Sequence, residues 1–248
     1  GGWSYDAGTA TLTLDGFQGE YIEANGDINI VLKGKNKITI SAESTEGIKS
    51  TGKVTIDDTI SPAQDCLDIY CSDGTESVSM IYTGGFGADY ATYIVGGTVN
   101  LVEENTRRRY VTGISRWAYV ENDASLNINL SADGGRNGVA ALLNLNTSGD
   151  TSFRVNSLSS SSYGVYSLDK KGSGDTALAA EGKAKNIDNK FTIGSTGNTG
   201  KITIKGYLTD FTPCRRKNRI VGVDNFLWSY FTENPQTGGL CRCVCDSL

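Results

Sequence analysis

The sequence predicts an all-β fold, a right-handed parallel β-helix, and three observations support this prediction. Short strand-like segments begin about every 25 residues along the chain. Apolar and polar residues alternate within these segments, and several repeats carry a second short apolar piece. A fixed period of this length is typical of solenoid proteins, whose neighbouring repeats bury each other's apolar faces. The eight segments cover residues 28–32, 54–56, 78–81, 99–102, 126–130, 153–155, 177–179 and 202–204.

The alternation identifies these segments as strands with one face turned inward. Leu126, Ile128 and Leu130 alternate with asparagines, which is the period-two pattern of a half-buried strand. The second apolar pieces each place Gly before an apolar residue, at 47–49, 113–115, 138–140 and 164–166. Two or three strands per turn, with Gly or Asn at the corners, describe a parallel β-helix. Parallel crossover connections are right-handed, which predicts the hand.

A β-sandwich is the alternative fold, because its short strands also recur between turn signals. It requires tight hairpins, yet few Asn-Gly or Asp-Gly pairs lie directly between two strong strands. We expect a β-helix at residues 1–209 and a C-terminal cap with a Cys-rich tail at residues 210–248. The tail holds Pro213 and the aromatic run 226–231. A cap would cover the unpaired backbone and apolar core of an open solenoid end.

Charge and composition exclude several classes of partner. The 248-residue chain has a formal net charge of −5 and no His, whereas phosphate binding needs a concentrated basic surface. We interpret the basic runs 107–109 and 215–217 as solvated turns and expect no nucleic acid partner. No stretch approaches the ~18 consecutive apolar residues of a membrane helix, so membrane insertion is not expected. The oligomeric state has no signature in the sequence.

Six cysteines suggest structural bridges or free thiols rather than a metal site. We expect the first two to lie on one corner, and Cys214 to approach the last three and staple the cap. The six are Cys66, Cys71, Cys214, Cys241, Cys243 and Cys245.

The N-terminal stretch carries a distinctive set of motifs. It begins W-S-Y-D at residues 3–6, continues with T-L-T-L at 11–14, and reads G-D-I-N-I-V-L-K-G-K-N-K-I-T at 26–39. These motifs resemble the repeats of a family of secreted Firmicutes proteins, the carbohydrate-binding β-helix domains. The likeness is specific over about the first sixty residues and looser to residue 206. It implies a right-handed β-helix outside the cell, polysaccharide binding and, in some relatives, calcium. It implies no catalytic residues.

Aromatic residues are dense between positions 82 and 119. Exposed rings can dock the apolar faces of sugars while phenol and indole groups bond to hydroxyls; packing in the core or at its edges is the alternative. Trp117 and Tyr119 are one residue apart and are expected to share a face. The seven aromatics are Tyr82, Phe86, Tyr90, Tyr93, Tyr110, Trp117 and Tyr119. The predicted carbohydrate-binding residues are Tyr90, Tyr93, Tyr110, Trp117 and Tyr119.

Three aspartates precede strands at intervals near the repeat. Asp123, Asp150 and Asp175 would stack on adjacent turns. Such an acidic ladder could recruit calcium through carboxylate and carbonyl oxygens. Alternatively, each Asp caps its own corner.

The sequence therefore predicts an extracellular or cell-surface protein that binds polysaccharide without transforming it, with calcium as a possible cofactor. An adhesin or structural stalk with a protein partner is one alternative. A calcium-dependent polysaccharide lyase is another, with Arg107, Arg108 or Arg109 as its base. A glycoside hydrolase is disfavoured, because the G-H-G and R-x-K segments of polygalacturonases are missing and the chain has no histidine. Asp57 and Asp58 are also expected on opposite faces of a strand.

Overall fold

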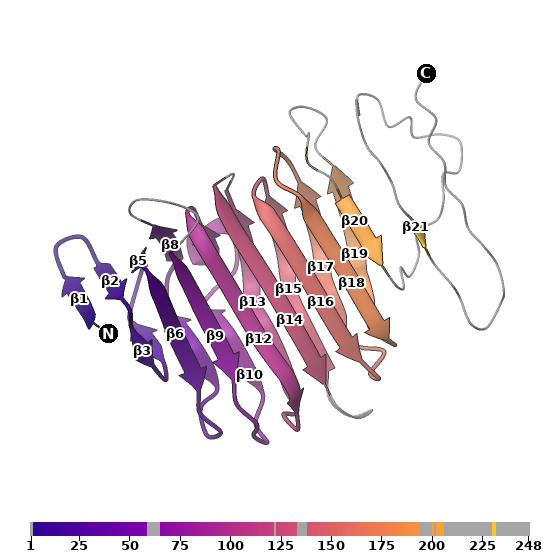
Figure 1. Ribbon diagram of the computed structural model, residues 1–248, viewed down its shortest axis with the longest axis horizontal. Helices are drawn as coiled ribbons and strands as arrows, with labels where there is room; N and C mark the ends of the chain where they lie inside the picture. Colours follow the sequence, from indigo (N-terminus) through magenta and orange to yellow (C-terminus); the bar gives the residue numbers. More distant parts are fainter. Residues whose placement is uncertain are drawn as a thin grey trace.

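The structure, a computed structural model, describes residues 2–58, 65–121, 123–132, 138–193, 200, 202–205 and 230–231. These residues form two β-sheets and one short 3₁₀ helix, η1 (Ala88–Tyr90), and contain no α-helix. Figure 1 shows the strands side by side in two layers, with the sequence colours running along the stack from the N-terminal to the C-terminal end. Among the described residues, no helix has the length and apolarity that crossing a bilayer requires.

The larger sheet, called sheet A here, has twelve strands. Its main path is β1 (Gly2–Asp6), β2 (Thr11–Asp15), β5 (Ile28–Lys33), β8 (Val54–Asp58), β11 (Thr92–Ile94), β13 (Tyr110–Val120), β10 (Val78–Thr83), β7 (Glu46–Ser50) and β4 (Ile22–Ala24). From β13 the sheet continues through β15 (Gly138–Thr147), β17 (Tyr163–Lys170) and β19 (Lys185–Ile193).

The second sheet, sheet B, has nine strands. In spatial order they are β3 (Gln18–Gly19), β6 (Lys35–Ile40), β9 (Cys66–Cys71), β12 (Gly97–Thr106), β14 (Ala124–Ala132), β16 (Asp150–Ser157), β18 (Thr176–Gly182), β20 (Ile202–Lys205) and β21 (Tyr230–Phe231).

The pairing between described strands is parallel, except that β1 pairs antiparallel with β2. The chain passes from one sheet to the other and back, and each strand pairs with the strand of the next passage through the same sheet. In sheet B, for example, Ser125 of β14 pairs with Asp150 of β16, and Thr151 of β16 pairs with Thr176 of β18. We call one passage through sheet B and sheet A a circuit. Since a β-sandwich consists of antiparallel sheets, the sandwich alternative is wrong.

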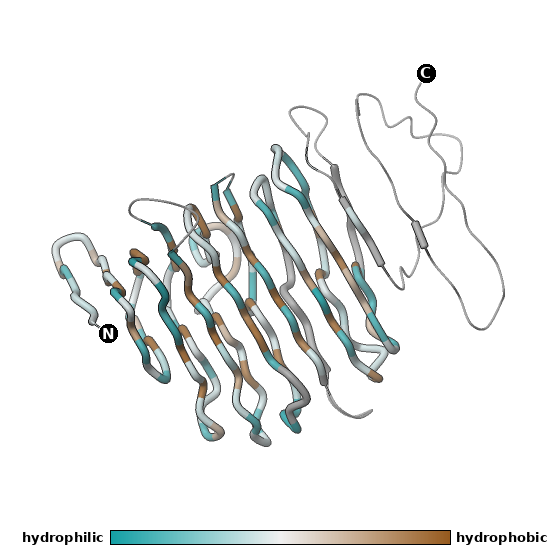
Figure 2. Tube along the Cα trace, in the orientation of Figure 1, coloured by the Kyte–Doolittle hydropathy of each residue, from teal (hydrophilic) through white to brown (hydrophobic). Residues whose placement is uncertain are grey.

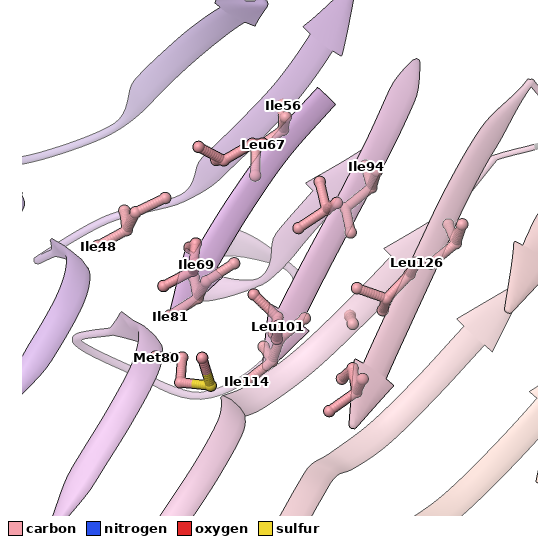
Figure 3. Packing of buried hydrophobic residues seen from close by; sticks show 14 of the residues in the cluster. Ile48, Ile56, Leu67, Ile69, Met80, Ile81, Ile94, Leu101, Ile114 and Leu126 are labelled. Atoms are coloured by element: carbon pink, nitrogen blue, oxygen red, sulfur yellow. The ribbon is translucent and has the colours of Figure 1, made fainter. Parts of the chain in front are cut away.

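The core lies between the sheets because inward positions are apolar at every circuit. Along sheet B, buried residues in register form one row: Ile38, Ile69, Leu101, Ile128, Phe153 and Leu178. Figure 2 shows hydrophobic and hydrophilic residues alternating along the strands. Figure 3 shows the core from close by, with Ile69 and Leu101 from sheet B and Ile81 and Ile114 from sheet A. Each side chain removed from water contributes about 1.5–3 kcal/mol, so stacked circuits stabilise one another.

The eight predicted segments are all strands, but they do not belong to a single sheet. Residues 28–32 and 54–56 lie in sheet A, whereas all segments from residue 99 onward lie in sheet B. Segment 78–81 is in sheet A too, yet it pairs with β7 and β13 rather than β8. The period of about 25 residues was therefore measured between strands of different sheets. Near the N-terminus the strongest alternation of apolar and polar residues falls on strands of sheet A, and from residue 99 onward it falls on strands of sheet B.

The circuits change from three short strands to two long ones at β13. The first half of β13 continues β10, and its second half continues β11. Before this change the chain makes an excursion at residues 84–91, so that Thr92 pairs with Val54, 38 residues earlier. Of the seven aromatics between residues 82 and 119, Phe86 and Tyr90 lie in this excursion.

Aspartate carboxylates fasten the corners of neighbouring circuits. The Asp27 carboxylate accepts the backbone N–H of Lys53 at 2.8 Å, and that of Asp150 accepts the N–H of Asp175 at 2.7 Å. Each bond satisfies a backbone donor that leaves the sheet at the corner.

Glycines at one corner allow the circuits to approach closely. Gly149, Gly174 and Gly200 follow one another through successive circuits, and a Cβ on Gly174 would overlap the carbonyl group of Gly149. A side chain at this corner would therefore force neighbouring backbones apart.

Arg108 is fully buried and ties together three circuits. Its guanidinium donates to the carbonyl oxygens of Ser72, Ser44 and Ser41 at 2.9, 3.0 and 2.7 Å. A Cβ on Gly74 would lie 2.8 Å from its Cζ. The interpretation of run 107–109 as a solvated turn is wrong for Arg108, because its side chain is buried and its guanidinium donates to three backbone carbonyl groups.

The cysteine prediction is wrong for the first pair. Cys66 and Cys71 are free thiols at opposite ends of β9, not on one corner. Five steps of about 3.3 Å separate their Cα atoms by roughly 16 Å, beyond the reach of a disulfide. The other four cysteines and the domain boundary at 209/210 lie outside the described residues.

Candidate functional site

Tyr93 and Tyr119 stack on the outer face of sheet A. They are register partners on β11 and β13. Their ring centroids are 4.6 Å apart and their planes differ by 6°. Trp117 lies on the same face, 6.5 Å from the Tyr119 ring and tilted by 33°. The prediction that Trp117 and Tyr119 share a face is confirmed.

The stack of Tyr93 and Tyr119 differs from the expected sugar-binding platform, because stacking covers one face of each ring. Each tyrosine covers one face of the other, and the Lys53 ammonium lies 5.8 Å from the Tyr93 ring. The Tyr93 hydroxyl also donates to the carbonyl oxygen of Ala88 at 3.2 Å. Sugar rings dock on open aromatic faces, whereas the facing surfaces of Tyr93 and Tyr119 are occupied by each other.

The other predicted aromatics do not join this stack. Tyr90 belongs to η1 and is 39% exposed, and the highly exposed Phe86 carries the Arg116 guanidinium 3.9 Å above its ring. Tyr110 stands at the opposite end of β13 from Tyr119, about 30 Å away at 3.3 Å per residue. Burial raises the pKa of Tyr110, which is hydrogen-bonded to Tyr163. The five predicted carbohydrate-binding residues therefore do not form one surface.

Two of the three predicted calcium ligands come together. Asp150 and Asp175 are exposed on adjacent circuits, and one Asp150 oxygen accepts the Asp175 N–H. Asp123 lies two residues before Ser125, the register partner of Asp150. No group of three or more Cys, Asp or Glu suited to a metal ion occurs among the described residues. Calcium binding stays a prediction, and the contact between Asp150 and Asp175 fits the corner role.

The arginines proposed as a lyase base are engaged elsewhere. Arg107 forms an ion pair with Asp73 at 2.7 Å, and its backbone N–H donates to the same carboxylate. These bonds lower the pKa of Asp73 to about 2. Arg108 is buried, and Arg109 is exposed. Neither Arg107 nor Arg108 is therefore positioned as a base in this structure.

Asp57 and Asp58 meet at one corner, although strand parity placed them on opposite faces. A Cβ on Gly96 would lie 2.6 Å from an oxygen of each carboxylate. Burial, followed by the charges of Asp57 and Asp65, raises the pKa of Asp58. Strand parity does not separate these two residues at the end of β8, because both carboxylates reach Gly96.

A groove of about 280 Å³ lies across the outer face of sheet B. It crosses β9, β12, β14 and β16, four neighbouring strands in Figure 1. Three steps of about 4.8 Å make it roughly 14 Å long. We call it the sheet B groove. Its side chains form two outward rows in register, Asp68–Asn100–Asn127–Ser152 and Tyr70–Val102–Asn129–Arg154.

The first row is a directed ladder of hydrogen bonds. Asn127 Nδ2 donates to Asn100 Oδ1 at 2.9 Å, and Asn100 Nδ2 donates to Asp68 Oδ1 at 2.6 Å. A carboxamide has two N–H donors and two lone pairs on oxygen. Each asparagine therefore keeps further donor and acceptor capacity for a bound molecule.

Long side chains close the second row at both ends. Tyr70 is 37% exposed, and the Lys37 ammonium lies 4.7 Å from its ring centroid. Lys37 comes from β6, on the side of β9 away from the groove, and covers one face of the Tyr70 ring, while Tyr70 itself lines the groove. At the other end Arg154 pairs with Glu181 at 3.1 Å. The groove thus combines one aromatic wall with a polar floor.

Sequence reasoning missed this groove because its asparagines looked like ordinary polar positions of alternating strands. A signal was present: Asn100 and Asn127 occupy equivalent positions of successive strands and are one period apart. The density of aromatic residues between positions 82 and 119 favoured a different surface instead. No protein-family model, curated protein or solved structure matches the chain.

Proposed function

We propose that the protein binds polysaccharide without transforming it, outside the cell or at its surface, and that its fold is a right-handed parallel β-helix. The fold proposal is supported by parallel circuits that share one core, together with the right-handedness of parallel crossovers. Calcium at Asp123, Asp150 and Asp175 remains part of the proposal as an optional cofactor.

The sheet B groove is the observation that carries this proposal. It is open, elongated across four strands, and lined by carboxamide, carboxylate, hydroxyl and phenol groups. Polysaccharides are extended chains whose hydroxyls both donate and accept hydrogen bonds, and whose rings stack on aromatic faces. A groove of roughly 14 Å fits a stretch on the order of a di- or trisaccharide within a longer chain.

The test is binding of soluble polysaccharides by the double variant Asn100→Ala/Asn127→Ala. Two neutral hydrogen-bonding partners contribute about 0.5–1.5 kcal/mol each. The variant should therefore lose on the order of 1–3 kcal/mol, about 5- to 150-fold in affinity, measured by calorimetry or affinity electrophoresis.

Asn146→Ala is the matched control, because Asn146 is a half-buried asparagine at an outward position of β15 in sheet A. It should bind like the wild type. Equal affinity of the double variant and the wild type would contradict the proposed site. Failure of the wild type to bind any polysaccharide would favour the adhesin or stalk alternative.

A further inference from the structure

We propose that the sheet B groove selects neutral, hydroxyl-rich polysaccharides and rejects polymers of uronic acids. This inference rests on the proposed function and names its ligand class. It is based on the charged side chains in and beside the groove, each of which contacts another side chain. They are Lys37, Asp68, Arg154 and Glu181.

Arg154 is the cation best placed to bind an acidic sugar, but Glu181 occupies it. Arg154 Nε lies 3.1 Å from one oxygen of Glu181, and a second guanidinium nitrogen lies 3.4 Å from the other. This two-bond contact uses the geometry with which arginine recognises a carboxylate. A uronate would have to displace Glu181 before it could bind Arg154 in the same way.

The other end of the groove disfavours a carboxylate as well. Asp68 places a negative charge in the floor, where it accepts from Asn100. Lys37 lies over the outer side of Tyr70 and is the register partner of Asp68. The charges of Lys37 and Arg154 are balanced by those of Asp68 and Glu181, so these four side chains add no net charge. The whole chain carries a formal charge of −5, which repels polyanions further.

The floor instead suits hydroxyl groups. Asn100 and Asn127 each retain donors and acceptors after forming the ladder, and a hydroxyl can use both at once. Tyr70 offers an aromatic face backed by a cation, which leaves the ring available to the apolar face of a sugar.

The test compares wild-type affinity for neutral arabinoxylan and glucomannan with that for polygalacturonate and alginate, in EDTA so that calcium cannot bridge acidic chains. We expect at least tenfold tighter binding of a neutral polymer, unchanged between low and high salt. The variant Glu181→Gln should gain several-fold affinity for an acidic polymer and change neutral binding less than twofold. Adding Arg154→Gln should remove the gain.

Tighter binding of polygalacturonate or alginate by the wild type, or no acidic gain in Glu181→Gln, would overturn the inference. This outcome is separate from failure of the proposed function, which shows when Asn100→Ala/Asn127→Ala leaves binding of every polymer unchanged. If no polymer binds the wild type, both proposals fall.

Discussion

Three consecutive arginines provide an internally controlled test of how the circuits are held together. Arg108 is buried with three carbonyl acceptors, Arg107 forms an exposed ion pair, and Arg109 is exposed. Replacing Arg108 with Met keeps the apolar stem and removes every donor. A hydrogen bond to a charged group contributes about 1.5–3 kcal/mol, and a buried acceptor that loses its partner costs about 1–3 kcal/mol.

We therefore expect Arg108→Met to lower the free energy of unfolding by about 3–5 kcal/mol, because three carbonyl groups lose a charged donor. Arg107→Met should cost less than about 1 kcal/mol, because exposed ion pairs contribute little. Arg109→Met should be neutral within about 0.5 kcal/mol. Urea unfolding followed by far-UV circular dichroism measures these differences as midpoint shifts. A midpoint for Arg108→Met equal to that of Arg109→Met would refute the argument that Arg108 joins three circuits.

Further predictions concern close packing and the buried thiol. Gly174→Ala should destabilise the protein by about 1–3 kcal/mol, because its Cβ would overlap Gly149; a melting temperature equal to that of Gly2→Ala, at an open position of the edge strand, would show that the corner relaxes. Burial raises the pKa of Cys71 to about 11, so iodoacetamide should alkylate it more slowly than Cys66 at pH 8, and faster after unfolding. Since the folded pKa lies above the ordinary value of 9.0, this thiol's contribution to stability is complete below about pH 9 and is lost as pH rises toward 11. Cys71→Ala should reduce the loss of stability over that range, and an unchanged pH profile would contradict the assignment.

The strands were predictable because alternation directly reflects the burial of one face. Leu126, Ile128 and Leu130 are all buried, as their spacing indicates. Sheet membership was not predictable from the same pattern. Residues 54–56 and 78–81 lie about one period apart but in separate arms of sheet A, because a period measured along the chain does not say which strands meet in space.

Side-chain roles at the candidate sites depended on details that spacing does not carry. The sequence gives no reason why Arg108, rather than Arg107 or Arg109, turns inward; that depends on how the chain bends between β12 and β13. Tyr93 and Tyr119 lie on the outer face of sheet A, but their face-to-face stack depends on their exact register. Without that register, a closed stack and an open sugar platform look alike.

A structure of the protein with a bound neutral oligosaccharide would test directly whether the sheet B groove is the binding site. We predict that the sugar lies across β9, β12, β14 and β16, with hydrogen bonds to Asn100 and Asn127 and one ring against Tyr70. An oligosaccharide bound instead beside Tyr93, Trp117 and Tyr119 on sheet A would contradict it.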